Sequence, residues 1–307
     1  MNRTTALRRV GLLVLGVNAI LVVAKGGVYL ATGSIAVGSE AVNSLADGVY
    51  SLVVVWGLYV TTQPPDPDHP HGHERIEPFV SLFVALGILI AGVAVLYNAV
   101  QSIETGAVAV GGLPAIAVLG GAAGVKYLLY RYCLRMSRTY HSPAIEATAL
   151  DNRADVLTAL AALIGVLGAS VGWPVLDPVA GAVVSLGIMY TGIEIVVDNV
   201  GYLIGVAPPE ELREEIIDRA LSHPDVHGVH DVVPHHVGPE VDVSLHLEIE
   251  GNRSLTDAHD IETDVVESIR DIPEVDDVFV HLDPKELGEW KDTDDSYTDG
   301  TDTNGIE

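Results

Sequence analysis

Six apolar stretches, each long enough to cross a lipid bilayer, occupy the first two thirds of this 307-residue chain. An α-helix rises about 1.5 Å per residue, so about 20 apolar residues span the hydrocarbon core of a membrane. The stretches are residues 8–31, 35–61, 77–103, 112–135, 143–171 and 176–203. Since 49% of the residues are hydrophobic and only 19% are charged, the composition also differs from that of a soluble globule. We therefore predict an α-helical membrane domain with six transmembrane helices over residues 1–207.

Two groups of three arginines indicate how these helices are oriented. They are Arg3, Arg8 and Arg9 at the first stretch, and Arg131, Arg135 and Arg138 between the fourth and the fifth. The links on the opposite side contain neither Lys nor Arg. Because basic loops remain in the cytoplasm, we expect a multi-pass protein of the cell membrane with both termini cytoplasmic.

After Pro208 and Pro209 the pattern changes to that of a small soluble domain. Helical periodicity and strand-like alternation occur in the order αββαβ, over residues 210–222, 229–234, 241–249, 254–270 and 275–282. This order predicts a two-layer, ferredoxin-like α+β domain over residues 208–285. From residue 286 to 307 the chain is rich in Asp, Thr and Gly, which predicts a disordered acidic tail.

Charge and motif content exclude several classes of function. The formal net charge is −26, with 29 acidic and 6 basic residues after position 207. Such a chain is a poor partner for nucleic acid, because phosphates need Lys and Arg to neutralise them. The single Cys133 excludes an intramolecular disulfide and any site with several cysteines. No metalloprotease, serine-hydrolase or phosphate-loop motif is present, so we expect neither an enzyme nor an organic cofactor.

Two pairs of polar residues interrupt the apolar stretches. Asn43 and Asp47 lie four residues apart in the second stretch, and Asp151 and Asp155 lie four apart in the fifth. Residues four apart share one face of a helix. If the two faces meet, three carboxylates and one amide oxygen converge inside the membrane, which suits a divalent cation.

The alternative is that each of these acids forms its own salt bridge. Lys25 and Arg153 are the basic residues that we expect nearby. Glu40, one turn before Asn43, is a candidate for a supporting contact or for a proton path.

A second candidate site lies in the link between the second and third stretches. Asp66, His69 and His73 belong to a segment of nine residues that contains three histidines and several carboxylates. Imidazole and carboxylate groups together suit zinc or a similar cation. The alternative is a polar loop whose histidines are only solvated.

The soluble domain is unusually rich in histidine. His246 lies on the polar face of an alternating strand, and His281 and Asp283 share one face of the last strand. His230 and His259 are further candidates. Their positions favour a metal site over histidines scattered on the surface.

Taken together, these segments resemble the cation diffusion facilitator family over residues 8–285. The motifs that carry the resemblance are 32–36, 43–47, 69–77, 151–156, 177–178 and 281–284. The resemblance implies a homodimer in the lipid bilayer that exports divalent metal ions from the cytoplasm in exchange for protons.

The resemblance also implies three metal sites. The transport site falls on Asn43, Asp47, Asp151 and Asp155. A loop site falls on Asp66, His69 and His73. A cytoplasmic binuclear site at the dimer interface falls on His230, His246, His259, His281 and Asp283.

Two features depart from the zinc-transporting members of this family. The transport quartet has no histidine, and an all-oxygen site favours a harder cation, so the chain resembles the manganese-exporting branch. Some members also pair a basic residue at the position of Arg75 with an acid after the last span, where this chain has Gly205. The alternatives are an exporter of Zn²⁺, Fe²⁺ or Co²⁺, a membrane metal sensor that does not transport, and a membrane metalloenzyme.

Overall fold

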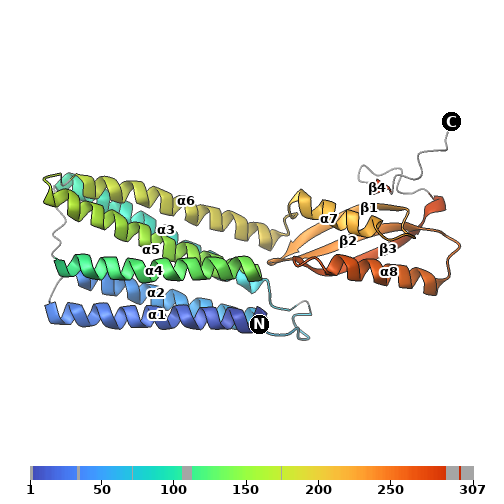
Figure 1. Ribbon diagram of the computed structural model, residues 1–307, viewed down its shortest axis with the longest axis horizontal. Coiled ribbons are helices and arrows are strands. Elements are labelled where there is room, and N and C mark those ends of the chain that lie inside the picture. Colours follow the sequence, from blue (N-terminus) through green and yellow to red (C-terminus); the bar gives the residue numbers. More distant parts are fainter. Residues whose placement is uncertain are drawn as a thin grey trace. The chain divides into compact units, whose positions relative to one another are not determined.

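The chain folds into two compact units, residues 1–200 and residues 201–307 (Figure 1). This computed structural model describes residues 3–32, 35–70, 72–105, 113–173, 175–287 and 297–298. Each unit has its own hydrophobic core. The two units are therefore described separately.

Six long helices form the first unit. They are α1 (Arg3–Thr32), α2 (Ile35–Thr61), α3 (Ile76–Thr105), α4 (Leu113–Tyr140), α5 (Pro143–Ser170) and α6 (Leu176–Ile204). All six predicted spans are confirmed as helices. Among the described residues, α1, α2, α3 and α6 contain segments long and apolar enough to cross a membrane. Helices α4 and α5 run beside these four (Figure 1); α4 carries the buried Lys126, and α5 carries Asp151 and Asp155.

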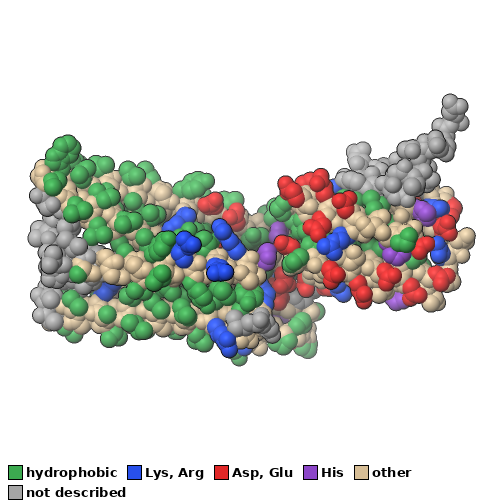
Figure 2. Space-filling model, viewed as in Figure 1, with side chains coloured by type: hydrophobic (Ala, Val, Ile, Leu, Met, Phe, Trp, Pro, Cys, Tyr) green, Lys and Arg blue, Asp and Glu red, His purple; other side chains and the backbone are tan. Residues whose placement is uncertain are grey.

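The outer surface of the six-helix unit is apolar, and its interior is closely packed. Large hydrophobic side chains such as Leu30 and Tyr190 are mostly exposed, and green side chains cover the helices in Figure 2. Inside, a Cβ added at Gly57 of α2 would lie 2.1 Å from Val80 of α3. Because lipid is as apolar as Leu, such close packing, rather than a hydrophobic effect, holds helices together in a membrane.

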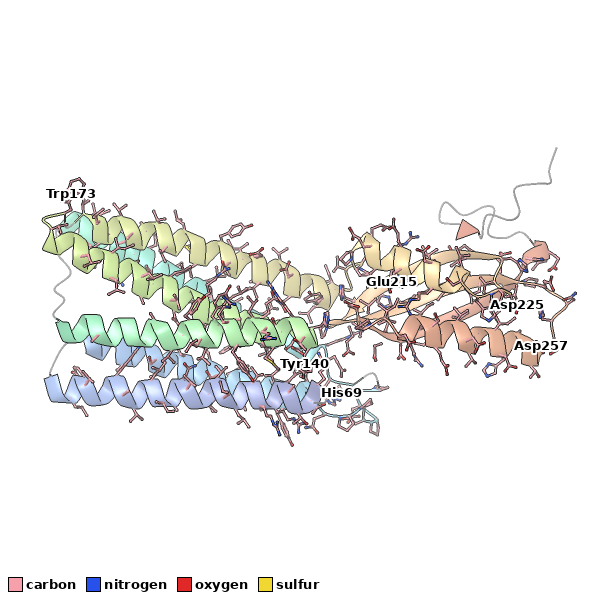
Figure 3. The ribbon with its side chains drawn as sticks, viewed as in Figure 1. His69, Tyr140, Trp173, Glu215, Asp225 and Asp257 are labelled. Atoms are coloured by element: carbon pink, nitrogen blue, oxygen red, sulfur yellow. The ribbon has the colours of Figure 1, made fainter. Side chains whose placement is uncertain are left out.

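A buried polar network joins three helices at one end of this unit. Glu77, in the first turn of α3, is fully buried and forms an ion pair of 3.3 Å with Arg3 of α1. The hydroxyl of Ser142, next to the start of α5, donates a hydrogen bond to the same carboxylate. Arg3 also donates to the carbonyl of Tyr140 over 3.2 Å. Figure 3 shows Tyr140 and His69 near this end of the helices and Trp173 at the other.

The second unit is a two-layer α+β domain. It contains α7 (Glu210–Leu221), β1 (Gly228–Val237), β2 (Glu240–Ile249), α8 (Leu255–Arg270) and β3 (Val275–Pro284). The predicted order αββαβ is confirmed. With the short β4 (Tyr297–Thr298), the strands lie in the order β3-β2-β1-β4, with β2 antiparallel to β1 and parallel to β3. Acidic side chains are numerous on the visible surface of this unit (Figure 2).

The alternation of β2 separates the two faces of this sheet. Its odd-numbered residues, from Val241 to Ile249, are buried in one core with apolar residues of α7 and α8. Its even-numbered residues therefore lie on the face away from the helices. This second face carries the histidines described below.

The predicted disordered tail begins at residue 286, and most of it lies outside the described residues. The structure describes Glu286 and Leu287, which belong to a short 3₁₀ turn, and β4 (Tyr297–Thr298). β4 pairs antiparallel with Gly228 and Val229 of β1. The edge of β1 offers unpaired backbone groups to which such a short strand can bind.

The Glu77 network generates a prediction about stability. Glu77→Gln removes the ion pair with Arg3 but keeps a similar shape, so the protein in detergent should unfold at a lower temperature. Since Arg3 retains access to water, we expect a loss of about 1–3 kcal/mol, below the usual cost of breaking a buried pair. Glu104→Gln, an exposed change in the same helix, is the control. Equal unfolding temperatures for the two variants would contradict the structural role of Glu77.

Candidate metal-binding sites

The two polar faces predicted to meet inside the six-helix unit do meet. Asp47 of α2 and Asp151 and Asp155 of α5 each place one carboxylate oxygen within 4.8 Å of the others. Asn43, one turn before Asp47, lines the same small cavity as Asp47 and Asp155. The structure therefore brings together the whole predicted quartet.

A polar contact between α1 and α2 fixes the turn that carries Asp47. The hydroxyl of Ser51 donates to the carbonyl oxygen of Asp47 over 2.7 Å. The same hydroxyl accepts a hydrogen bond of 2.8 Å from the amide of Asn18 in α1. Both Asn18 and Ser51 are buried. This side of the cluster is thus anchored to a neighbouring helix.

Lys126 of α4 also lies in this cluster, although it was not predicted from the sequence. Its Nζ lies 2.8 Å from Oδ2 of Asp47 and 2.7 Å from Oδ2 of Asp155, and its side chain is 4% exposed. A signal was present, because this lysine lies in the middle of the predicted fourth span, where a charge needs a partner. Sequence spacing alone does not show which helix supplies that partner.

The two basic residues that we expected near the acids behave differently. Arg153 donates a hydrogen bond of 2.7 Å to Thr191 of α6, so it links α5 to α6. Lys25 of α1 is buried and lines the cavity. Lys25 therefore lies near the acids as expected, but these two are not the only basic residues nearby, since Lys126 bridges two of the carboxylates.

The cavity at this cluster is small and polar. Its volume is about 30 Å³, enough for a single water-sized occupant or a largely dehydrated ion. Residues of α1, α2, α4 and α5 line it, including Ala122, Ala123 and Thr158.

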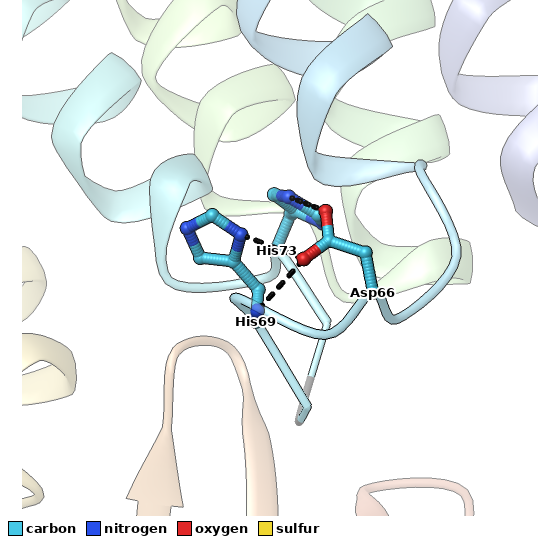
Figure 4. A group of neighbouring side chains, drawn as sticks. All are labelled: Asp66, His69 and His73. Carbon is cyan, nitrogen blue, oxygen red and sulfur yellow. Dashed lines mark hydrogen bonds and ion pairs between the residues drawn. The ribbon is translucent and has the colours of Figure 1, made fainter.

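The predicted loop site also forms a cluster, which Figure 4 shows. Nδ1 of His69 lies 3.1 Å from one oxygen of Asp66, and Nε2 of His73 lies 3.5 Å from the other. The two imidazole rings are 4.5 Å apart between centroids. The three residues can therefore offer one nitrogen or oxygen each to a common cation.

Backbone contacts hold this loop in place. The backbone amide of His69 donates a hydrogen bond of 2.8 Å to the carboxylate of Asp66. This bond lowers the pKa of that carboxyl below its ordinary value. The hydroxyl of the buried Thr61, at the end of α2, donates a hydrogen bond of 3.1 Å to the carbonyl oxygen of His73. Asp66 is thus ionised at neutral pH, which suits a metal ligand.

Three histidines form a row across the sheet of the second unit. His230 of β1 pairs with His246 of β2, which pairs with His281 of β3. Asp283 lies among them: its carboxylate is 2.8 Å from His246 Nδ1, 3.4 Å from His230 Nε2 and 3.2 Å from His281 Nε2. The structure therefore brings together four of the five residues predicted here.

Glu248 is a further acid at this cluster that the sequence analysis missed. Its carboxylate is 1% exposed and lies 3.4 Å from Nε2 of His230. The signal was the alternation of β2, which places Glu248 on the same face as His246. A buried carboxylate beside a metal site can bind the ion or orient an imidazole.

The remaining predicted residues lie apart from these clusters. The side chain of His259 is 72% exposed on α8, behind the other face of the sheet, and lies 3.6 Å from Glu262. Arg75 is exposed, and Gly205 ends α6 with a positive φ of 73°, which favours glycine. Glu40 lies in α2, but its side chain is outside the described residues.

Comparisons with known proteins agree with this arrangement. Residues 11–204 match the cation efflux transmembrane domain, and residues 208–285 match the cytoplasmic domain of cation efflux proteins. An uncharacterized transporter of Methanocaldococcus jannaschii is 34% identical, with 89% of this chain and 95% of that protein covered. The manganese efflux system protein MneP of Bacillus subtilis is 30% identical, with 90% and 96% covered.

The magnetosome protein MamB of Magnetospirillum gryphiswaldense is also 30% identical, with 85% of this chain and 88% of that protein covered. The family matches span both units, and each of these relatives extends over most of the chain. The chain belongs to the cation efflux family, the cation diffusion facilitators, and is a metal efflux transporter.

Proposed function

We propose that this transporter exports Mn²⁺ from the cytoplasm in exchange for protons. The observation that carries the proposal is the convergence of Asp47, Asp151 and Asp155, with Asn43, at a cavity between helices. Every candidate ligand there is an oxygen atom, and carboxylate and carbonyl ligands suit Mn²⁺ better than softer cations. The similarity to manganese efflux system proteins of Bacillus subtilis supports the same cation.

Charge balance supports coupling to protons. Three carboxylates carry a formal charge of −3, of which one bound divalent cation compensates two. When the cation leaves toward the outside, the buried carboxylates lose that compensation, and protons are the counter-charge available from water. Alternating access of the cavity to the two sides of the membrane would then exchange metal for protons.

A second candidate is export of Zn²⁺, Fe²⁺ or Co²⁺ by the same route. The loop cluster of Asp66, His69 and His73 supplies imidazole, which favours these softer cations. This cluster lies outside the helices, so we assign it to delivery of the ion and the quartet to selection. The quartet determines which cation crosses, because transport requires passage through it.

We further propose a homodimer in the cell membrane with both termini and the second unit in the cytoplasm. Arginines at the first helix and between the fourth and fifth support this orientation. In the dimer, His259 would join the histidine row of the partner chain, because the sheet separates it from the row of its own chain. Metal bound there would favour one arrangement of the two second units over another.

Transport in proteoliposomes tests the proposed site. With an imposed pH gradient, the native protein should move Mn²⁺ faster than Zn²⁺, and the flux should vanish without the gradient. Asp155→Ala should reduce the flux to the level of empty vesicles, because it removes one of three carboxylates. Asp218→Ala, an exposed change in the second unit, is the control. Normal flux in Asp155→Ala would overturn the site assignment.

The oxygen-only ligand set predicts that selectivity can be changed. Replacing both Asn43 and Asp151 with His adds two nitrogen ligands, which should shift the ratio of Zn²⁺ flux to Mn²⁺ flux upward by about tenfold or more. Competition between the two ions in the same vesicles measures this ratio. An unchanged ratio in an active variant would show that selectivity lies outside the quartet.

The assignment of His259 to the partner chain predicts a metal-dependent change in the dimer. Spin labels on α8 of the two chains should report a change in separation when Zn²⁺ is added. His259→Ala should abolish this change, whereas His223→Ala should retain it, because His223 lies near Asp264 on the helical face. A native dimer with no metal-dependent change would contradict the proposed regulation.

A further inference from the structure

Lys126 occupies an unusual place for a positively charged side chain. It lies on α4 with only 4% of its side chain exposed, and its ammonium bridges carboxylates that belong to two other helices. A buried ammonium needs ionic partners, because its transfer from water to an apolar interior is costly. Here the partners, Asp47 and Asp155, are the residues to which we assign the transported cation.

The ammonium and a metal ion would compete for the same oxygen atoms. Lys126 Nζ approaches Oδ2 of Asp47 and Oδ2 of Asp155 to within 2.8 Å. A hard divalent cation binds carboxylate oxygens at about 2.0–2.6 Å, so it would lie almost where the ammonium lies. Lys126, Asp47 and Asp155 all line the same small cavity, so both cations would lie at one site. In this low-dielectric interior, the repulsion between them would be strong.

We propose that Lys126 is a tethered counter-cation of the transport site, which binds Asp47 and Asp155 when the metal is absent and withdraws when the metal binds. This inference rests on the proposed function, since it concerns the same carboxylates. The ammonium can change position because it ends a flexible four-carbon stem. It therefore sets the affinity of the site for metal by direct competition.

The proposal explains how an empty transporter can remain folded with three acids close together. Without Lys126, Asp47, Asp151 and Asp155 would hold three like charges within 4.8 Å of one another. The tethered ammonium compensates one of them and links α2, α4 and α5. It also speeds release, because its return to the carboxylates stabilises the site as the metal departs. Tighter metal binding and slower turnover should therefore accompany its removal.

If Lys126 had a purely structural role, its removal would change the affinity for metal in the opposite direction. If Lys126 only held the three helices in place, its removal would loosen the quartet and weaken metal binding. The sign of the change in affinity separates the two roles. The charge on residue 126, and not its size, should determine the result.

The test measures Mn²⁺ binding to the full-length protein in lipid nanodiscs at pH 8, using the electron paramagnetic resonance signal of free Mn²⁺. The Asp155→Ala protein, measured in parallel, gives the binding at all other sites. Lys126→Met should lower the Kd of the Asp155-dependent site by at least about tenfold, which corresponds to about 1.4 kcal/mol. The same variant should transport Mn²⁺ with a lower maximal rate in proteoliposomes.

Matched variants make the result specific. Lys126→Arg keeps the charge and should bind Mn²⁺ within about threefold of the native protein, or about 0.7 kcal/mol. Arg153→Met removes a positive charge from the neighbouring helix face, where Arg153 contacts Thr191, and should also stay within that range. If Lys126→Met fails to fold, Lys126→Gln replaces it as the uncharged variant, because Gln removes the charge but retains hydrogen-bond donors.

Each outcome decides one question. If native protein shows no Asp155-dependent Mn²⁺ binding, the proposed function fails before Lys126 is considered. If native protein binds Mn²⁺ and the folded, uncharged variant binds it equally or more weakly, the counter-cation proposal is overturned. If Arg153→Met tightens binding as much as Lys126→Met, a general field effect replaces competition, and the proposal is also overturned.

Discussion

Charge compensation inside the membrane is the constraint on which the arrangement of the six helices depends. Three carboxylates, on α2 and α5, lie within 4.8 Å of one another where water cannot freely solvate them. Lys126 from α4 bridges two of them, so one interaction holds three helices around the cavity. Buried charges of this kind are expensive in lipid and are retained where function requires them. The hydrogen bonds from Asn18 to Ser51 and from Ser51 to the carbonyl oxygen of Asp47 also help to hold Asp47 at this cluster.

The three clusters differ in ligand chemistry in a way that follows from their surroundings. The cluster between the helices offers oxygen atoms, whereas the loop cluster and the sheet cluster combine imidazole with carboxylate. A site that must release its ion quickly benefits from hard, weakly binding ligands and from a competing ammonium. A site that senses or collects metal benefits from tighter nitrogen ligands. Transport and regulation can thus use different affinities in one chain.

The sequence predicts most of the fold because its signals are local. Apolar length gave the six helices, and the alternation of β2 gave both faces of the sheet. The pairs at 43 and 47 and at 151 and 155 show which helix faces carry acids, and these faces meet. Lys126 and Glu248 were missed because their roles depend on partners supplied by other elements. His259 lies on a helix that the sequence predicts, but the distance of this residue from the histidine row depends on how α8 packs against the opposite face of the sheet.

Anomalous X-ray scattering from Mn²⁺ bound to the full-length protein would locate the cation and show where Lys126 lies beside it. We expect an anomalous peak among Asp47, Asp151 and Asp155, with the ammonium of Lys126 farther from both carboxylates than the present 2.7 and 2.8 Å. Without Mn²⁺, the ion pairs should be intact. A structure in which Mn²⁺ occupies the histidine row of the sheet, while Lys126 still bridges Asp47 and Asp155 and no peak lies between the helices, would contradict the account.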